Sequence, residues 1–222
     1  MGTALFYANA APPGEVTAIS TLFSSGMDTN GQALPAGAAD PHYFLTASAY
    51  STPPPPAIPA TVMANHPNWL ANDAASRWLG PVSQGSANVA VGSYHFRTTF
   101  DLAGFDPATA QITCQVVVDN DLTNVVLNGT RLGLTYSGFT AFSSAYTLST
   151  GFVAGTNTLD FLTANLGAAA NPAGLRVKAS GTARKYAPVN TPVAPGAAPW
   201  YSRRAFVLEG NPATAGLRLR AV

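Results

Sequence analysis

The sequence predicts an all-β fold, a two-sheet antiparallel β-sandwich with an extended arm at each end. Runs that alternate apolar and polar residues recur about every 10 to 15 residues, with turn residues between them. The chain holds 20 Gly and 18 Pro in 222 residues, which suits many short strands joined by turns. No stretch of useful length shows the i, i+3, i+4 spacing of an amphipathic helix.

The clearest strand runs from residue 94 to residue 100. Large aromatic residues alternate there with polar ones, which is the period-2 pattern of a strand with one buried face. Tyr94, Phe96 and Phe100 are expected on that buried face.

A second strand is predicted over residues 110–118, followed by a turn. Its apolar residues alternate with Thr113 and Gln115, which are expected on the outer side. Cys114 is the only cysteine, so no intrachain disulfide can form, and its place in the alternation predicts a core residue. The cluster of Asp119, Asn120 and Asp121 is predicted to break the strand, because these short side chains favour turns. The inward-facing residues are expected to be Ile112, Cys114, Val116 and Val118.

The third element is a hairpin centred on Asn128-Gly129. Residues 125–127 and 130–132 are rich in strand-forming residues and flank this pair. A type I′ turn requires positive φ at both central positions, and Asn-Gly is the pair that favours it most.

The rest of the domain is assigned by the same patterns. The Pro-rich segment 52–56 is expected to be an extended loop. Further strands are predicted at residues 3–8, 16–23, 41–46, 139–148, 158–163 and 175–181.

Composition divides the chain into three parts. Residues 1–14 form an N-terminal arm, residues 15–183 the β-sandwich, and residues 184–222 a Pro-rich linker with a basic C-terminal arm. The C-terminal part holds six basic residues against Glu209 alone, a charge of +5 that leaves −4 for the remainder.

Two short runs in that arm, residues 204–208 and 217–220, are expected to pair as a hairpin or to add to the sheet edge of another chain. Their apolar residues are too few for a core of their own, so we expect them to be ordered by lying against a partner. Basic residues flank the strip and would meet carboxylates or carbonyl groups there. The residues expected in this contact are Arg203, Arg204, Phe206, Leu208, Leu217, Arg218, Leu219 and Arg220.

Catalysis is not expected. The chain contains no nucleophile elbow, paired His at metal spacing, phosphate loop or dinucleotide fingerprint. Asp101, Asp106, Asp119 and Asp121 are expected to cap backbone N–H groups at strand ends. His42 is expected to be a strand residue rather than a metal ligand.

A sugar-binding site is one interpretation of the amide-rich segment 65–78. Trp69 with Asn72 and Arg77 would offer a flat aromatic ring beside polar groups, which suits the apolar faces and hydroxyl rims of sugars. The alternative is that the ring fills a core, because Trp does so commonly in β-sandwiches. Trp78, which leads into Leu79-Gly80, is expected to be a core residue.

A calcium site is the other candidate. Asp28, Asn30 and Asp40 would supply hard oxygen ligands of the kind Ca²⁺ prefers, and no other cofactor is expected. The alternative is a structural turn, because the full ligand set of a helix-loop-helix calcium site is absent.

Seven sequence words between residues 19 and 183 resemble the galactose-binding-like jelly-roll module of bacterial proteins that carry a PEP-CTERM sorting signal. This resemblance implies a two-sheet jelly roll whose loops at one end often bind glycans without catalysis. The sorting tail is absent and the basic arm stands in its place, which argues against export to the cell surface. The words lie at residues 39–43, 76–79, 94–101, 104–110, 126–129, 151–161 and 171–177.

The function predicted from the sequence is that of a noncatalytic structural and binding component of a large assembly. A phage virion accessory protein, in a decoration, collar or fibre role, is the expected form, assembled in the host cytoplasm. Its partners would be further copies of the chain or capsid and tail proteins, with a host glycan as a second ligand. No run approaches the ~18 apolar residues of a membrane span, and nucleic-acid binding is disfavoured because the basic residues are dispersed. The alternative is a secreted or cell-surface carbohydrate-binding module whose signal has been removed.

Overall fold

The structure is a computed structural model that describes residues 6–7, 14–48, 57–186, 205–209 and 218–221. The chain divides into two units. One comprises residues 15–185, and the other combines residues 1–14 with residues 186–222. The β-sandwich predicted from the sequence, residues 15–183, ends two residues before the unit found in the structure.

The prediction of an all-β protein is confirmed. Strands make up 53% of the described residues, and no helix occurs among them. In the part of the chain that the structure describes, no helix has the length and apolar character needed to cross a membrane.

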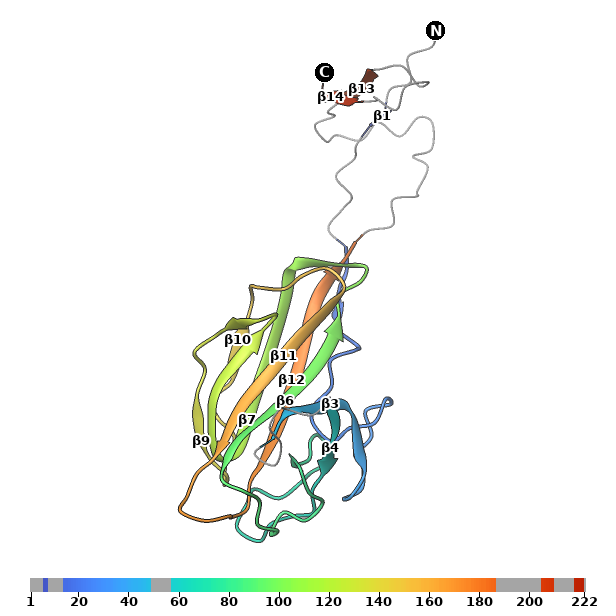
Figure 1. Cartoon of the computed structure of the whole chain (residues 1–222). Coiled ribbons are helices and arrows are strands. Elements are labelled where there is room, and N and C mark those ends of the chain that lie inside the picture. The colour runs from blue at the N-terminus through green and yellow to red at the C-terminus, as the bar shows by residue number, and fades with distance from the viewer. Residues whose placement is uncertain (1–5, 8–13, 49–56, 187–204, 210–217, 222) are drawn as a thin grey trace. The chain divides into compact units, whose positions relative to one another are not determined.

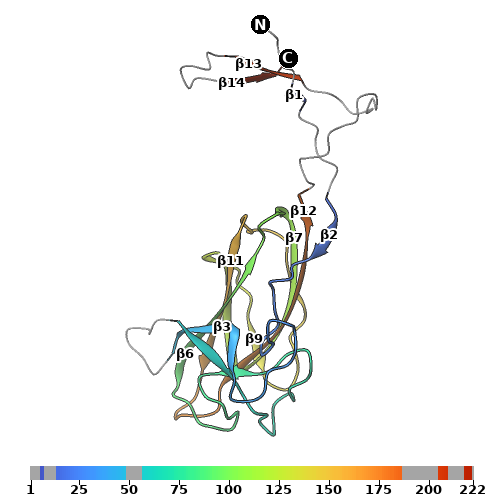
Figure 2. The same ribbon diagram turned by 90° about the vertical axis from the view of Figure 1, so that its right-hand side faces the viewer.

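Residues 15–185 form one large antiparallel sheet (Figures 1 and 2). Its strands are β2 (Val16–Ala18), β3 (Ala39–Ala47), β4 (Ile58–Val62), β5 (Leu79–Gly80), β6 (Gly92–Asp101), β7 (Phe105–Leu127), β8 (Thr130–Arg131), β9 (Tyr136–Gly138), β10 (Tyr146–Leu148), β11 (Thr156–Asn165) and β12 (Gly174–Lys185).

This sheet closes on itself. The hydrogen-bonded order runs β7, β11, β6, β3, β4, β5, β12, and β12 pairs again with β7, which gives a seven-stranded antiparallel barrel. β2 pairs with the outer side of β12, and β8, β9 and β10 pair with β7. Closure gives each of the seven ring strands a hydrogen-bonded neighbour on both sides, although β12 and β5 share only the pair Leu175–Leu79.

Strand β7 makes the closure. Its first part pairs with β12 as far as Asp119, and its last part pairs with β11 from Asp121 onward. The predicted turn at Asp119–Asp121 is therefore wrong: β9 also pairs with Asp121, and neighbours on both sides keep the backbone extended. One strand of 23 residues thus joins what the sequence had divided into two runs.

Two other predicted elements are shorter than expected. The strand proposed for 16–23 ends at Ala18, and of 139–148 only Tyr146–Leu148 is strand. Phe139 and Phe142 instead pack against a small apolar cluster outside the ring. Strands β4, β5 and β9 were not predicted, because they are short and lack a clear alternation.

The main core fills the ring as the alternation predicted. Tyr94, Phe96 and Phe100 are buried, as are the four inward-facing residues of β7 between 112 and 118. Cys114 is a free, buried thiol, and burial raises its pKa to about 12, so it is a core residue as predicted.

The Asn128-Gly129 turn is confirmed. Asn128 has φ of 49° and Gly129 has φ of 84°, and Leu127 pairs with Thr130 across the turn. The Asn128 side chain also binds strand β11, since its Oδ1 accepts a hydrogen bond from Thr158 N at 2.9 Å.

The second unit contains a three-stranded antiparallel sheet in the order β1 (Phe6–Tyr7), β13 (Ala205–Glu209), β14 (Arg218–Ala221). The two C-terminal runs pair with each other, and the N-terminal strand adds to β13. The pairs Phe6–Phe206, Phe206–Ala221 and Leu208–Leu219 share one face by register. The pairs Val207–Arg220 and Glu209–Arg218 share the other face.

Candidate functional site

A second apolar cluster lies on the outside of the closed sheet. Val117 points outward from β7, yet it is fully buried because Met63, Trp69 and Trp78 cover it. All three belong to the segment between β4 and β5 or to its margins. That segment therefore forms a fixed cover over one part of the sheet.

Trp69 is buried in this cluster, with 6% of its surface exposed. Its ring centroid lies 4.4 Å from that of Trp78 and 5.0 Å from that of His66. Its Nε1 donates to Asp119 Oδ2 at 2.9 Å, so both the apolar ring and the polar tip are satisfied. This burial favours the alternative interpretation, in which the Trp69 ring fills a core, over the sugar-binding interpretation.

Trp78 is a core residue, as predicted, and is fully buried. Its Nε1 donates to Leu70 O at 2.7 Å, which ties the ring to the covering segment.

Asn72 and Arg77 hold the covering segment in place through hydrogen bonds. Asn72 Oδ1 accepts from Trp78 N at 2.7 Å, and its Nδ2 donates to Met63 O at 2.9 Å. Arg77 N donates to Ser25 O at 2.8 Å. The structure places Asn72 and Trp69 in one segment, but it does not form an open aromatic site from these residues.

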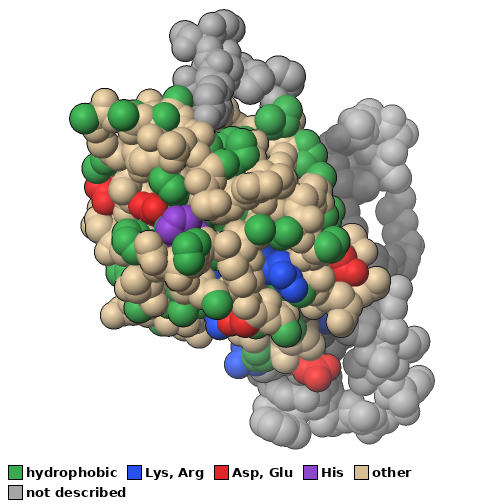
Figure 3. Space-filling model, turned by 90° about the horizontal axis from the view of Figure 1, so that it is seen from below, with side chains coloured by type: hydrophobic (Ala, Val, Ile, Leu, Met, Phe, Trp, Pro, Cys, Tyr) green, Lys and Arg blue, Asp and Glu red, His purple; other side chains and the backbone are tan. Residues whose placement is uncertain are grey.

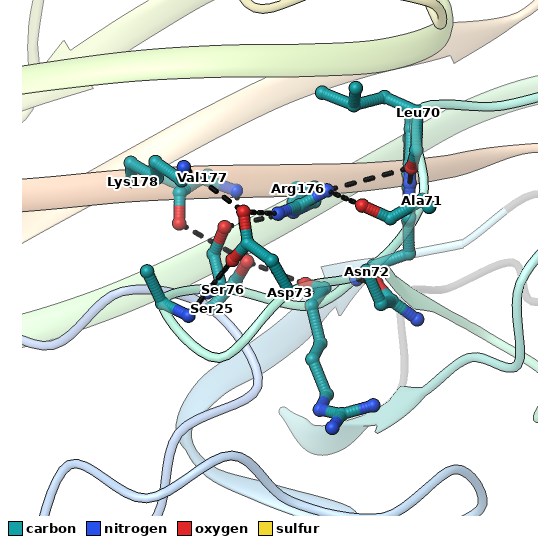
Figure 4. A network of polar contacts seen from close by, with 12 residues as sticks. Ser25, Leu70, Ala71, Asn72, Asp73, Ser76, Arg176, Val177 and Lys178 are labelled. Atoms are coloured by element: carbon teal, nitrogen blue, oxygen red, sulfur yellow. Dashed lines mark hydrogen bonds and ion pairs between the residues drawn. The ribbon is translucent and has the colours of Figure 1, made fainter.

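An ionic clamp fixes this segment to β12 (Figure 4). Arg176 is fully buried, and its Nε donates to Ser76 Oγ at 2.8 Å while its Nη1 donates to Ala71 O. Its Nη2 lies 2.7 Å from Asp73 Oδ2. Burial lowers the pKa of Arg176 and the charge of Asp73 opposes that shift; an arginine remains charged in either case.

Asp73 is the centre of the clamp. Its Oδ1 accepts from Ala75 N at 2.8 Å and Ser76 N at 3.0 Å, and its Oδ2 also lies 3.1 Å from Lys178 Nζ. Partial burial by itself would raise the pKa of Asp73. The hydrogen bonds from Ala75 N and Lys178, with the charge of Arg176, outweigh that effect and lower the pKa to about 2.

A shallow hollow of about 190 Å³ adjoins the clamp on the outer face of β7 and β12. Phe142 borders the same region, with Arg176 Cζ 5.0 Å and Lys178 Nζ 4.8 Å from its ring centroid. The hollow is lined by Ser24, Ala75, Thr113, Gln115, Lys178 and Ser180, among others. No sequence pattern indicates this arrangement, because Arg176 and Ser76 are 100 residues apart.

The predicted calcium ligands act as turn caps. Asp28 Oδ1 accepts from Asn30 N and Gln32 N, both at 2.8 Å. The fully buried Asp40 accepts from three backbone N–H groups, those of Gly26, His42 and Tyr43. Burial raises the pKa of Asp40, and the bonds from His42 and Gly26 reduce that shift. These contacts favour the structural-turn interpretation, and no group of three or more His, Cys, Asp or Glu that could hold a metal occurs among the described residues.

The other carboxylates are also engaged. Asp101 and Asp106 cap Ala103 N and Ala108 N, as predicted. The predicted backbone-capping role is wrong for Asp119 and Asp121, whose recorded partners are side chains: Trp69 and Asn120 for the first, Ser137 for the second. Asp160 accepts both Nε and Nη2 of Arg97, at 2.6 and 3.0 Å. His42 is a strand residue, as predicted, and stacks on Phe23 at 3.7 Å.

Of the predicted assembly residues, Phe206 and Leu208 lie in β13, and Arg218, Leu219 and Arg220 lie in β14. Arg203, Arg204 and Leu217 lie outside the described residues.

Comparison of the chain with protein-family models, with curated proteins and with solved structures gives no match.

Proposed function

We propose that this protein is a noncatalytic building block of a large assembly, and that the sheet formed by its two chain ends attaches it to neighbouring molecules. The observation that carries the proposal is that both termini pair with each other in a unit separate from the closed sheet.

The terminal sheet needs another layer. By register, one of its faces is formed by residues of apolar type, namely Phe6, Phe206, Leu208, Leu219 and Ala221. A sheet that is apolar on one face is stable when that face packs against a second layer. Three strands of two to five residues are too short to supply that layer themselves.

The state of the carboxylates supports a noncatalytic role. A carboxyl group that acts in general acid-base chemistry must be within reach of a substrate and have a pKa suited to proton transfer. Each of the eight Asp in the chain accepts hydrogen bonds from backbone or side-chain groups of the protein. Their geometry therefore suits a rigid scaffold.

The closed sheet suits exposure on the outside of a particle. Each ring strand has a hydrogen-bonded neighbour on both sides, and in the view from below the described residues present mainly hydrophobic and uncharged side chains (Figure 3). We propose a decoration, collar or fibre position in a phage virion, with further copies of this chain or capsid and tail proteins as partners and with assembly in the host cytoplasm.

We further propose that the closed sheet is a galactose-binding-like jelly roll. Three of the resembling words place residues at structural positions: Asp40 caps its turn, Trp78 fills the outer cluster, and Asn128-Gly129 makes the hairpin. An experimental structure in which the strand order differs from that of jelly rolls would refute this relationship.

Phe206→Asp in the full-length chain tests the attachment. The charge would lie in the proposed contact, so we expect the variant to remain a protomer in sedimentation velocity under conditions where the wild-type chain assembles. Its thermal unfolding, recorded by tryptophan fluorescence, should be unchanged, because Trp69 and Trp78 report on the closed sheet.

Val207→Asp is the matched control, because Val207 occupies the opposite face by register. It should retain assembly. If Phe206→Asp assembles normally, or if it lowers the melting temperature of the isolated protomer, the terminal sheet is not an assembly element. Deletion of residues 186–222 should likewise leave a folded chain that no longer assembles.

A further inference from the structure

We propose that the hollow beside Lys178 binds an acidic saccharide, with the ammonium group of Lys178 pairing with the carboxylate of the sugar. This inference is independent of the terminal sheet and concerns only the outer face of β7 and β12.

The walls of the hollow come from four parts of the chain held at fixed positions. Gln115 pairs with Lys178, and Thr113 with Ser180, across the β7–β12 ladder. Ala75 stands on the segment that the clamp holds, and Ser24 is fixed by bonds to Ala179 N and O. A site built on paired strands is preorganised, which lowers the entropic cost of binding.

The charge at this place is unbalanced. Arg176 and Lys178 share the single carboxylate of Asp73. Arg176 is fully buried and committed to Ser76, Ala71 and Asp73, so the excess positive charge is presented through Lys178. Its side chain is 35% exposed, and an ammonium group has three donors, of which the bond to Asp73 uses one. An anionic group in the hollow would complete the pairing.

The remaining groups suit a ligand rich in hydroxyls. Thr113 and Ser180 are exposed on adjacent strands and can donate and accept. Gln115 Nε2 donates to Ser143 O at 3.1 Å, which orients its Oε1 as an acceptor. Ala75 and Ala179 are the apolar residues among those that line the hollow, and Phe142 lies beside it against Lys178.

The size of the hollow agrees with one sugar ring. Its volume of about 190 Å³ is more than ten times the roughly 10–15 Å³ that one water molecule needs on the same measure. A bare phosphate or sulfate would fill only part of that space and would meet one exposed cation. The combination of one accessible cation, hydroxyl groups and an amide oxygen therefore favours a saccharide carboxylate.

The test is a titration of the full-length protein with glucuronate, followed by NMR chemical shifts of the amides in β7 and β12. Glucose, acetate and inorganic phosphate serve as parallel ligands. We expect saturable shifts around residues 113–115 and 178–180 with glucuronate, and affinities at least tenfold weaker with glucose and with acetate. Shifts of equal size and affinity with phosphate would show a general anion site and overturn the proposal, as would equal binding of glucose.

Lys178→Gln should weaken glucuronate binding at least tenfold, whereas Lys185→Gln, farther along the same strand, should not change it. Because Lys178 also touches Asp73, Thr113→Val combined with Ser180→Ala gives a second test that leaves the clamp intact. That double variant should also weaken glucuronate binding severalfold while its melting temperature stays within a few degrees of the wild-type value. Binding that survives both variants, or an absence of saturable shifts with glucuronate, would refute the site.

Discussion

At the scale of single residues, the most consequential side chains are aspartates that accept several hydrogen bonds from other parts of the protein. Asp73, Asp119 and Asp40 each stand where burial would raise the pKa of the carboxyl group. Only Asp73 meets two cations, and its pKa is lowered. For Asp73 the hydrogen bonds from Ala75 N and Lys178, together with the charge of Arg176, outweigh the effect of burial.

Asp73 should make stability depend on pH in the acid range. Its folded-state pKa of about 2 lies below the ordinary value of 3.8, so its contribution is present above about pH 4 and is lost as the pH falls toward 2. Because its side chain is 46% exposed, solvent screening reduces that contribution to about 1 kcal/mol. Asp73→Asn should remove this part of the pH dependence in urea unfolding followed between pH 2 and pH 6.

Asp106→Asn is the control for that experiment. Asp106 caps Ala108 N, and no ion pair is recorded for it among the described residues. Its replacement should leave the acid dependence assigned to Asp73 in place. A wild-type curve that is flat between pH 2 and pH 4 would contradict the assignment.

Trp69 and Asp119 should be energetically coupled. Trp69→Phe removes the donor to a buried carboxylate and leaves it without that partner, so we expect a loss of about 1–3 kcal/mol in the free energy of unfolding. The loss should be smaller in an Asp119→Asn background, because the neutral amide costs less to leave unpaired. Strictly additive losses in a double-mutant cycle by chemical denaturation would show that the bond contributes nothing to the coupling.

At the scale of elements, two features govern the sheet. Strand β7 connects β12 to β11 and so closes the ring, and the Asn128-Gly129 turn returns the chain to pair with it. The turn depends on backbone conformation rather than on packing, because a Cβ at Gly129 would meet nothing within 4 Å.

Gly129→Val should therefore destabilise the protein by backbone strain alone. The φ of 84° places a β-branched residue in the left-handed region, and we expect a loss of about 1–2 kcal/mol in urea unfolding. Gly129→Asn is the matched variant, since Asn tolerates this region, and it should lose less. Equal losses for the two variants would argue that some contact, and not the φ angle, decides the cost.

At the scale of the whole molecule, the chain contains a closed sheet with a large core and, in a separate unit, a small three-stranded terminal sheet. This contrast predicts two levels of amide protection in hydrogen exchange. Amides of residues 116–118 should exchange only through global unfolding, because these residues are buried in the middle of β7 and pair with β12. On the other edge Val118 pairs with β9, and Val116 N donates to Ser143 Oγ.

Amides of β13 and β14 should exchange rapidly in the free protomer and become protected on assembly. A three-stranded sheet of this length has little stability without a second layer. If these amides are as protected in the protomer as those of β7, the terminal sheet already has its packing partner within the chain.

The sequence by itself determined the local features. The alternation in residues 94–100 and 110–118 identified two strands and their buried faces, and Asn128-Gly129 identified a turn with positive φ at both positions. These predictions hold because side-chain period and turn chemistry are set by residues adjacent in the chain. The short strands β4, β5 and β9 carry no such signal.

Only the tertiary structure decided how the segments combine. Asp119 and Asp121 read locally as a turn, yet pairing with β12, β9 and β11 keeps them in a strand. The sequence left both a sugar-binding ring and a core ring open for Trp69, and in the structure Met63, Trp78 and Val117 bury it while Asp119 accepts its N–H. The clamp joins Arg176 to Asp73 and Ser76 across about half the chain. Each outcome depends on residues that are distant in the sequence. The free energy gained by burying and pairing side chains with these residues exceeds the local preference for a turn or an exposed position that the sequence pattern indicates.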